Sequence, residues 1–238
     1  MVETRSASLR EGAPRPAATR SIGARALAES VGTLFLVATV VGSGIMGERL
    51  SGGNMAIALL ANSLATGAGL IALILAFGPV SGGHFNPVVS LVESRRGLLP
   101  WREAGVYILA QICGGLAGVA AANLMFGLSL VTPSRHVRDG PAQMLAEAVT
   151  TAGLVLVIRG ASRLGTLAVA IAAGGYIASA YWFTASTSFA NPAVTLARSL
   201  TDSFSGIRLA DTPAFIAAQL AGGAAALLLG SRIFRQSA

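Results

Sequence analysis

The sequence reads Ser81-Gly82-Gly83-His84-Phe85-Asn86-Pro87-Val88 in its first half and repeats this pattern, in degenerate form, as Ser188-Phe189-Ala190-Asn191-Pro192-Ala193. Both copies approach an Asn-Pro step through small residues and continue with the composition of a short helix. Pro loses no hydrogen bond in the first turn of a helix, and Asn is a favoured N-cap residue. Each copy therefore predicts a helix N-terminus, with free N–H donors and a partial positive charge, at its Asn.

The composition is typical of a chain that crosses a membrane several times. Of the 238 residues, 53% are hydrophobic and only 11% are charged. Six apolar segments have about the 20 residues that cross a bilayer core. They are residues 24–46, 54–77, 104–126, 142–160, 164–184 and 213–234. The sequence thus predicts an all-α membrane protein, and membrane topology explains the net charge of +7 better than a nucleic-acid partner does.

The segments that follow the two Asn residues are too short to span a bilayer. Residues 86–94 and 192–200 hold about nine residues each, roughly half of the length that a span needs. Non-helical backbone at membrane depth is tolerated only where protein or a water-filled cavity surrounds it. We therefore expect two re-entrant half-helices in addition to the six spans.

Matching signals in the two halves of the chain predict an internal repeat. Glu29 opens the first span and Glu147 the fourth, each within Leu-Ala-Glu. Gln111 lies in the third span and Gln219 in the sixth, each within Ala-Gln-x-x-Gly-Gly. Because each copy has three spans, an odd number, the second copy enters the membrane from the opposite side. The two Asn-Pro helix ends are then expected to meet near the midplane of the bilayer.

The repeat and the distribution of arginine predict the domain organisation. Residues 1–23 are rich in Arg, Ala and Pro without an apolar run, and we expect a disordered cytosolic tail there. Residues 24–238 form one membrane domain, with repeats at about 24–126 and 142–238. Twelve of the 17 arginines fall in the segments on the side of the N-terminus, so both termini are expected in the cytosol and the protein in the inner membrane.

Five polar residues within the spans and loops are candidates for supporting the half-helices. Glu29 and Glu147 are costly in lipid, so we expect each to face the protein interior and accept from backbone N–H groups of a re-entrant loop. The alternative is that both lie at the interface and face water. Gln111 and Gln219 are expected to anchor loops or join helices. His84 has two open roles, which are loop support through a hydrogen bond and gating by protonation.

Six spans in two inverted halves, together with the two Asn-Pro motifs, resemble the aquaporin or major intrinsic protein family over nearly the whole chain from about residue 24. The resemblance implies a pore within each protomer, a homotetramer in the lipid bilayer, no catalysis, and no cofactor or metal. A solute at the pore centre must accept from both Asn amides, which opposes protons and cations. The residues of this centre would be Asn86, Pro87, Val88, Asn191, Pro192 and Ala193, and Val88 departs from the family's usual Ala.

The resemblance also implies a second constriction, a selectivity filter outward of the Asn pair, at Thr66, Ser179, Ser188 and Val194. Most members carry Arg at the position of Val194, and the water and glycerol patterns also have aromatic side chains in the filter. This chain is therefore expected to have a wider, neutral, hydroxyl-rich ring, suited to water, glycerol-like polyols and neutral metalloid hydroxides such as arsenite. With Val at this position, the chain resembles a bacterial branch of the family that is associated with arsenic resistance. A shift of one residue in the assignment would replace Ser179 by Ala178 or Ala180, and Tyr176 or Phe183 one turn away would then narrow the ring.

Two other interpretations stay open. A secondary transporter with a midplane substrate site also has discontinuous helices, although coupled transport usually needs an ionisable residue at that site. A water-only channel of the same family is the second. An enzyme is disfavoured, because the single Cys113 and two widely separated His residues provide neither a nucleophile with its base nor a metal cluster.

Overall fold

The computed structural model describes residues 20–234, and this part of the chain is helical without any strand. The tail expected at residues 1–23 lies almost wholly outside the described residues. Two short 3-10 turns, Ser162–Leu164 and Leu209–Asp211, precede α6 and α8. The α-helices are α1 (Ile22–Leu50), α2 (Met55–Ser81), α3 (Pro87–Arg95), α4 (Trp101–Met125), α5 (Pro141–Ala161), α6 (Thr166–Phe183), α7 (Pro192–Arg198) and α8 (Thr212–Ile233).

Six of these helices are long and apolar enough to cross a membrane, which confirms the predicted all-α fold. They are α1, α2, α4, α5, α6 and α8, while α3 and α7 have nine and seven residues. The largest differences in bounds are four residues, at the ends of the first two spans: α1 continues to Leu50, and α2 continues through Pro79 to Ser81, where α2 ends. It stops there because Gly82 adopts a left-handed conformation (φ 96°), which ends a helix at little cost for glycine.

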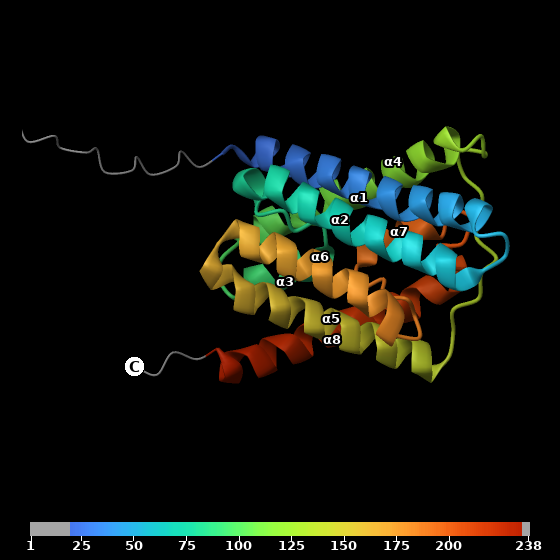
Figure 1. Ribbon diagram of the computed structural model, residues 1–238. Helices are drawn as coiled ribbons and strands as arrows, with labels where there is room; N and C mark the ends of the chain where they lie inside the picture. Colours follow the sequence, from blue (N-terminus) through green and yellow to red (C-terminus); the bar gives the residue numbers. More distant parts are fainter. Residues whose placement is uncertain (1–19, 235–238) are drawn as a thin grey trace, which may run out of the picture.

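The six long helices run side by side, and the two half-helices lie in opposite halves of the bundle (Figure 1). The helix α1 packs on α4 and α2, whereas α5 packs on α8 and α2 packs on α6. The start of α1 and the end of α8 lie at the same end of the bundle, and α3 lies in the half nearer to that end (Figure 1). This arrangement agrees with two inverted copies of three spans and one half-helix.

Glycines allow the closest helix contacts at equivalent places in the two repeats. A Cβ on Gly114 of α4 would lie 2.1 Å from the carbonyl oxygen of Ser30 in α1. A Cβ on Gly222 of α8 would lie 2.3 Å from the carbonyl oxygen of Ala148 in α5. No side chain larger than hydrogen fits at these distances, so Gly114 sets the spacing of α1 from α4 and Gly222 sets that of α5 from α8.

Candidate functional site

Each Asn of the two Asn-Pro motifs is the N-cap of a half-helix. The side-chain oxygen of Asn86 accepts from the backbone N–H of Val88 at 2.9 Å. The side-chain oxygen of Asn191 accepts from the backbone N–H of Ala193 at 3.0 Å. Pro87 and Pro192 occupy the first helical position, where the missing N–H has no intrahelical role. The cap chemistry of the sequence thus begins both half-helices at the expected residues.

The side-chain amides of these caps also join the two repeats. Asn86 Nδ2 donates to the carbonyl oxygen of Ala190 at 2.7 Å, and Asn191 Nδ2 donates to that of Phe85 at 2.8 Å. Each amide nitrogen carries two hydrogens, and these contacts use one of them. Both residues line the same cavity, which leaves a second N–H on each for a molecule inside it.

The loops before the half-helices have the same unusual backbone conformation in both repeats. Phe85 and its equivalent Ala190 have φ of 47° and 49°, and Gly83 and its equivalent Ser188 have φ of 63° and 56°. A left-handed conformation of a residue other than glycine costs roughly 1–3 kcal/mol and persists only where the surroundings hold it. The buried carboxylates described next provide that support.

The carboxylate of Glu29 is buried against the first of these loops. It accepts from the backbone N–H groups of His84 and Phe85 at 2.9 and 2.7 Å. It also accepts from Ser81 Oγ at 2.6 Å and from Gln111 Nε2 at 2.8 Å. The four donors account for both oxygens, and the carboxylate does not face water.

Glu147 has the equivalent position in the second repeat. Its carboxylate accepts from the backbone N–H groups of Phe189 and Ala190 at 2.9 and 2.8 Å, and from Gln219 Nε2 at 2.6 Å. Gln219 Nε2 also donates to the hydroxyl of Thr195 in α7 at 2.8 Å. The same carboxylate and amide therefore fix both the loop and the half-helix that follows it.

His84 lies between the first loop and α3. Its Nδ1 is 3.0 Å from the hydroxyl of Ser90, and this hydroxyl accepts from Gln111 Nε2 at 3.0 Å. The imidazole packs edge-on against Tyr107, with 5.5 Å between ring centroids, and the Tyr107 hydroxyl donates to the carbonyl of Ser81. His84 therefore joins the loop to α3 through Ser90, and it lines the cavity as well.

A cavity of about 280 Å³ lies between the helices and includes both Asn side chains. We call it the lumen. Its wall is largely apolar and consists of stripes of residues spaced by four, the spacing that keeps side chains on one face of a helix. The stripes are Leu36 and Val40 of α1, Thr66, Leu70 and Ile74 of α2, Leu154 and Ile158 of α5, and Val169, Ala173, Ile177 and Tyr181 of α6.

Three of the four residues expected at the second constriction line the lumen, and Ser179 does not. Thr66, Ser188 and Val194 are lining residues. Ser179 is exposed on the outer side of α6, and its hydroxyl donates to a carbonyl one turn earlier. Tyr181 faces the lumen instead, with its hydroxyl 3.2 Å from that of Thr66. Side chains two positions apart on a helix point about 200° apart. The expectation for Ser179 therefore selected the wrong face of α6.

The expectation of a ring without aromatic side chains is corrected by the same observation. Tyr176 and Phe183, the aromatics considered from the sequence, pack on each other with ring centroids 6.0 Å apart, and neither lines the lumen. The aromatic that does so is Tyr181. The stripe of four-residue spacings from Val169 onward is the sequence signal that would have identified it.

An arginine lines the lumen one turn of α7 beyond the ring that the sequence predicted to be neutral. Arg198 follows Val194 by one turn of α7, and its side chain is buried. Its guanidinium carbon lies 3.4 Å from the centroid of the Phe189 ring, and its Nε donates to the carbonyl of Ser205. The spacing of four residues puts Arg198 on the same face of α7 as Val194. The positive charge that is absent at position 194 is therefore present one turn later, at position 198.

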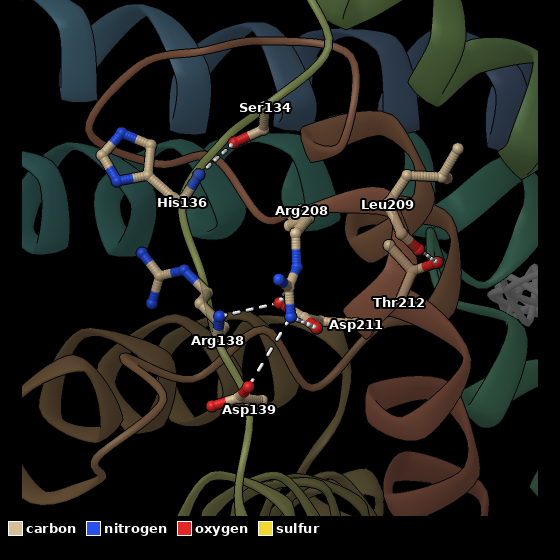
Figure 2. Close-up of polar contacts among 8 residues, drawn as sticks. All are labelled: Ser134, His136, Arg138, Asp139, Arg208, Leu209, Asp211 and Thr212. Carbon is tan, nitrogen blue, oxygen red and sulfur yellow. Dashed lines mark hydrogen bonds and ion pairs between the residues drawn. The ribbon is translucent and has the colours of Figure 1, made fainter.

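The connection between α4 and α5, residues 126–140, lies at the end of the bundle opposite to the start of α1 (Figure 1). Figure 2 shows the backbone nitrogen of Arg138 directed at Asp211, with 2.9 Å to its Oδ2, while the guanidinium points away. Arg208 donates to Asp211 at 2.7 Å and lies 3.6 Å from Asp139 (Figure 2). Burial lowers the pKa of the Arg138 guanidinium and the carboxylate of Glu147 raises it. These contacts hold the connection against the segment that precedes α8.

Comparison with known proteins places this geometry in a family. Residues 17–163 match the model of the family described as Major intrinsic protein. Aquaglyceroporin AqpS of Rhizobium meliloti (strain 1021) is 53% identical over 205 residues, which cover 86% of this chain and 88% of that protein. Aquaporin NIP1-4 of Oryza sativa subsp. japonica is 37% identical over 101 residues, 42% of this chain and 36% of that protein.

A solved structure has the same fold at low sequence identity. The X-ray structure of the aquaglyceroporin from Plasmodium falciparum matches with a TM-score of 0.72 and 16% identity, over 90% of this chain and 97% of that chain. The family match extends over more than half of the sequence, and the bacterial relative is similar across both repeats. The chain therefore belongs to the major intrinsic protein family, whose members are membrane channels rather than enzymes.

Proposed function

We propose that this chain is a passive channel for small uncharged solutes, namely water, glycerol-like polyols and neutral metalloid hydroxides such as arsenite. The observation that carries the proposal is the lumen, in which two Asn amides lie at two capped half-helix ends within an apolar wall. The name of the aquaglyceroporin relative supports glycerol-like solutes.

The mechanism follows from the donors at the centre of the lumen. A solute oxygen that passes Asn86 and Asn191 accepts from the amide N–H of each that the loops do not use. A water molecule that accepts from both cannot also accept from a neighbouring water, so a continuous chain of proton donors is interrupted there. The positive ends of α3 and α7 oppose cations at the same point. Conduction then requires no ion gradient.

The proposed filter consists of Thr66, Tyr181, Ser188 and Val194. Thr66 and Tyr181 share a hydrogen bond, and Ser188 Oγ is buried in the lumen wall without a hydrogen-bond partner among the described residues. These hydroxyl groups can exchange hydrogen bonds with the hydroxyls of a polyol or a metalloid hydroxide. The second candidate is a water-only channel, which the presence of Tyr181 and Arg198 in the lumen favours because both side chains narrow it.

We further propose that the protein is a homotetramer in the inner membrane with both termini in the cytosol. The shared end of α1 and α8 and the excess of arginine on that side support this orientation. The tetramer rests on the family resemblance. Lumen residues of α3 then face the cytosolic side, and those of α7 face the outer side.

A panel of solutes in liposomes tests the proposal. Purified protein should raise the permeability to water, glycerol and arsenite above that of empty liposomes, with a flux that rises linearly with concentration and needs no ion gradient. A rise for water alone would favour the water-only channel. Saturable flux that depends on protons or sodium would contradict a channel of any kind.

A further inference from the structure

The lumen faces of the two half-helices carry opposite charges at equivalent positions. The lining residues of each half-helix lie three and seven residues after the Asn, a spacing that keeps side chains on one helix face. Glu93 is the seventh residue after Asn86, and Arg198 is the seventh residue after Asn191. The full sets are Asn86, Val89 and Glu93 in the first repeat and Asn191, Val194 and Arg198 in the second.

The two charges differ in how they are paired. Glu93 accepts from Arg96 at 2.6 Å, so the charge at that end is balanced by a neighbour in the same wall. Within residues 20–234, Arg198 has no carboxylate at ion-pair distance. Its Nε has an acceptor in the carbonyl of Ser205, whereas its Nη2 is buried without any hydrogen-bond partner. A guanidinium has five N–H donors, and most of those of Arg198 are unused.

A second arginine adds to the positive charge near Arg198. The guanidinium of Arg138 lies over the same Phe189 ring, 5.0 Å from its centroid, and donates to the carbonyls of Gly206 and Ser186. Neither arginine has an ion pair among the described residues, and the carboxylate of Glu147 already accepts three hydrogen bonds. The Phe189 ring and the carbonyl of Ser205 fix the position of Arg198 without neutralising it.

We infer that Arg198 is the residue that excludes cations from the filter of this chain, in place of the arginine that is absent at position 194. The inference rests on the proposed channel function. A fixed charge in the low-dielectric wall of a narrow lumen repels cations much more strongly than it would in water. Nη1 of the same side chain has no acceptor among the described residues and is not enclosed as Nη2 is, so it can donate to the oxygen of a neutral solute, and Arg198 rejects charge while it admits polyols.

Substitutions at Arg198 separate charge from shape. In liposomes under an imposed membrane potential, Arg198→Gln should raise potassium permeability at least about tenfold above wild type, because it removes the charge and keeps an amide donor. Arg198→Lys should remain closed to cations at neutral pH. Arg135→Gln is the matched control, since it removes an exposed arginine from the same end of the molecule and outside the lumen. Glycerol flux is measured on the same liposomes.

The possible outcomes distinguish the inference from the proposed function. Glycerol flux through Arg198→Gln without any cation flux would overturn the inference and leave Arg198 a structural role only. Absence of glycerol flux in wild type would overturn the proposed function. If Arg198→Gln does not fold, Arg198→Lys decides, because cation flux through it should rise as the pH is increased to about 10 and the amine loses its charge, whereas wild type stays closed. No rise would overturn the inference.

Discussion

Replacing Glu147 by Gln tests how strongly a buried carboxylate supports the second re-entrant loop. The side chain keeps its size, but one of its two oxygens becomes an NH₂ group. The wild-type oxygens accept from the backbone N–H groups of Phe189 and Ala190 and from Gln219 Nε2. All three partners are donors. The new NH₂ group is a donor as well, so at least one of the three loses its acceptor.

The structure gives the expected magnitude. A buried backbone N–H that loses its acceptor costs about 1–3 kcal/mol, and hydrogen bonds to a neutral oxygen are roughly half as strong as those to a charged one. We therefore expect the free energy of unfolding of Glu147→Gln to fall by about 2–4 kcal/mol. The left-handed conformations of Ser188 and Ala190 lose their support at the same time, so glycerol flux should fall as well.

Two measurements separate these effects. Thermal unfolding in detergent gives the change in stability, and glycerol flux in liposomes gives the change in conduction. The matched control is Glu48→Gln, at an exposed residue near the end of α1 that accepts from the backbone N–H of Phe204 at 3.3 Å. This control should change stability by no more than about 0.5 kcal/mol. If Glu147→Gln were as stable and as conductive as Glu48→Gln, the carboxylate would not be what holds the loop.

Two further substitutions test the lumen wall and the helix packing. Val194→Arg places a second guanidinium beside Arg198, so glycerol permeability in liposomes should fall much more than water permeability, while Val194→Leu should lower both modestly. Unchanged glycerol flux in Val194→Arg would mean that position 194 lies outside the path of the solute. Gly114→Ala should lower the free energy of unfolding by about 1–3 kcal/mol, because its Cβ would lie 2.1 Å from the carbonyl oxygen of Ser30. Gly105→Ala, with nothing within 4 Å, should raise it by about 0.5–1 kcal/mol, and equal effects at the two glycines in thermal unfolding would contradict the packing described for α1 and α4.

Most of the fold could be predicted because its signals are local. Hydrophobic length determines the spans, and the cap chemistry of Asn86 and Asn191 begins the half-helices where the structure has them. The repeated Glu and Gln residues indicated which polar groups have equivalent surroundings. The left-handed backbone at Thr187 and Ser188 has no such signal, because neither residue is glycine.

The lining residues near the proposed second constriction could be predicted only in part. Motif spacing gives the position of a residue along the chain. Whether that residue lines the lumen depends on the rotation of its helix about the helix axis. An error of two positions turns a side chain by about 200°, which is the difference between Ser179 and Tyr181. Arg198 was missed for a related reason. Only the course of α7 along the lumen shows that the next turn after Val194 still faces it.

Thiol modification of Val194→Cys tests most directly whether solutes pass through the lumen of a single chain. Cys113 is exposed on α4 and is first replaced by Ser, so that one thiol remains. The protein is labelled in detergent with a polar thiol reagent, labelling is verified by mass, and glycerol flux is measured after reconstitution. Labelled Val194→Cys should show no flux above empty liposomes, and labelled Ser179→Cys should conduct as the unlabelled protein does, because Ser179 faces outward. Full glycerol flux through completely labelled Val194→Cys would contradict passage through this lumen.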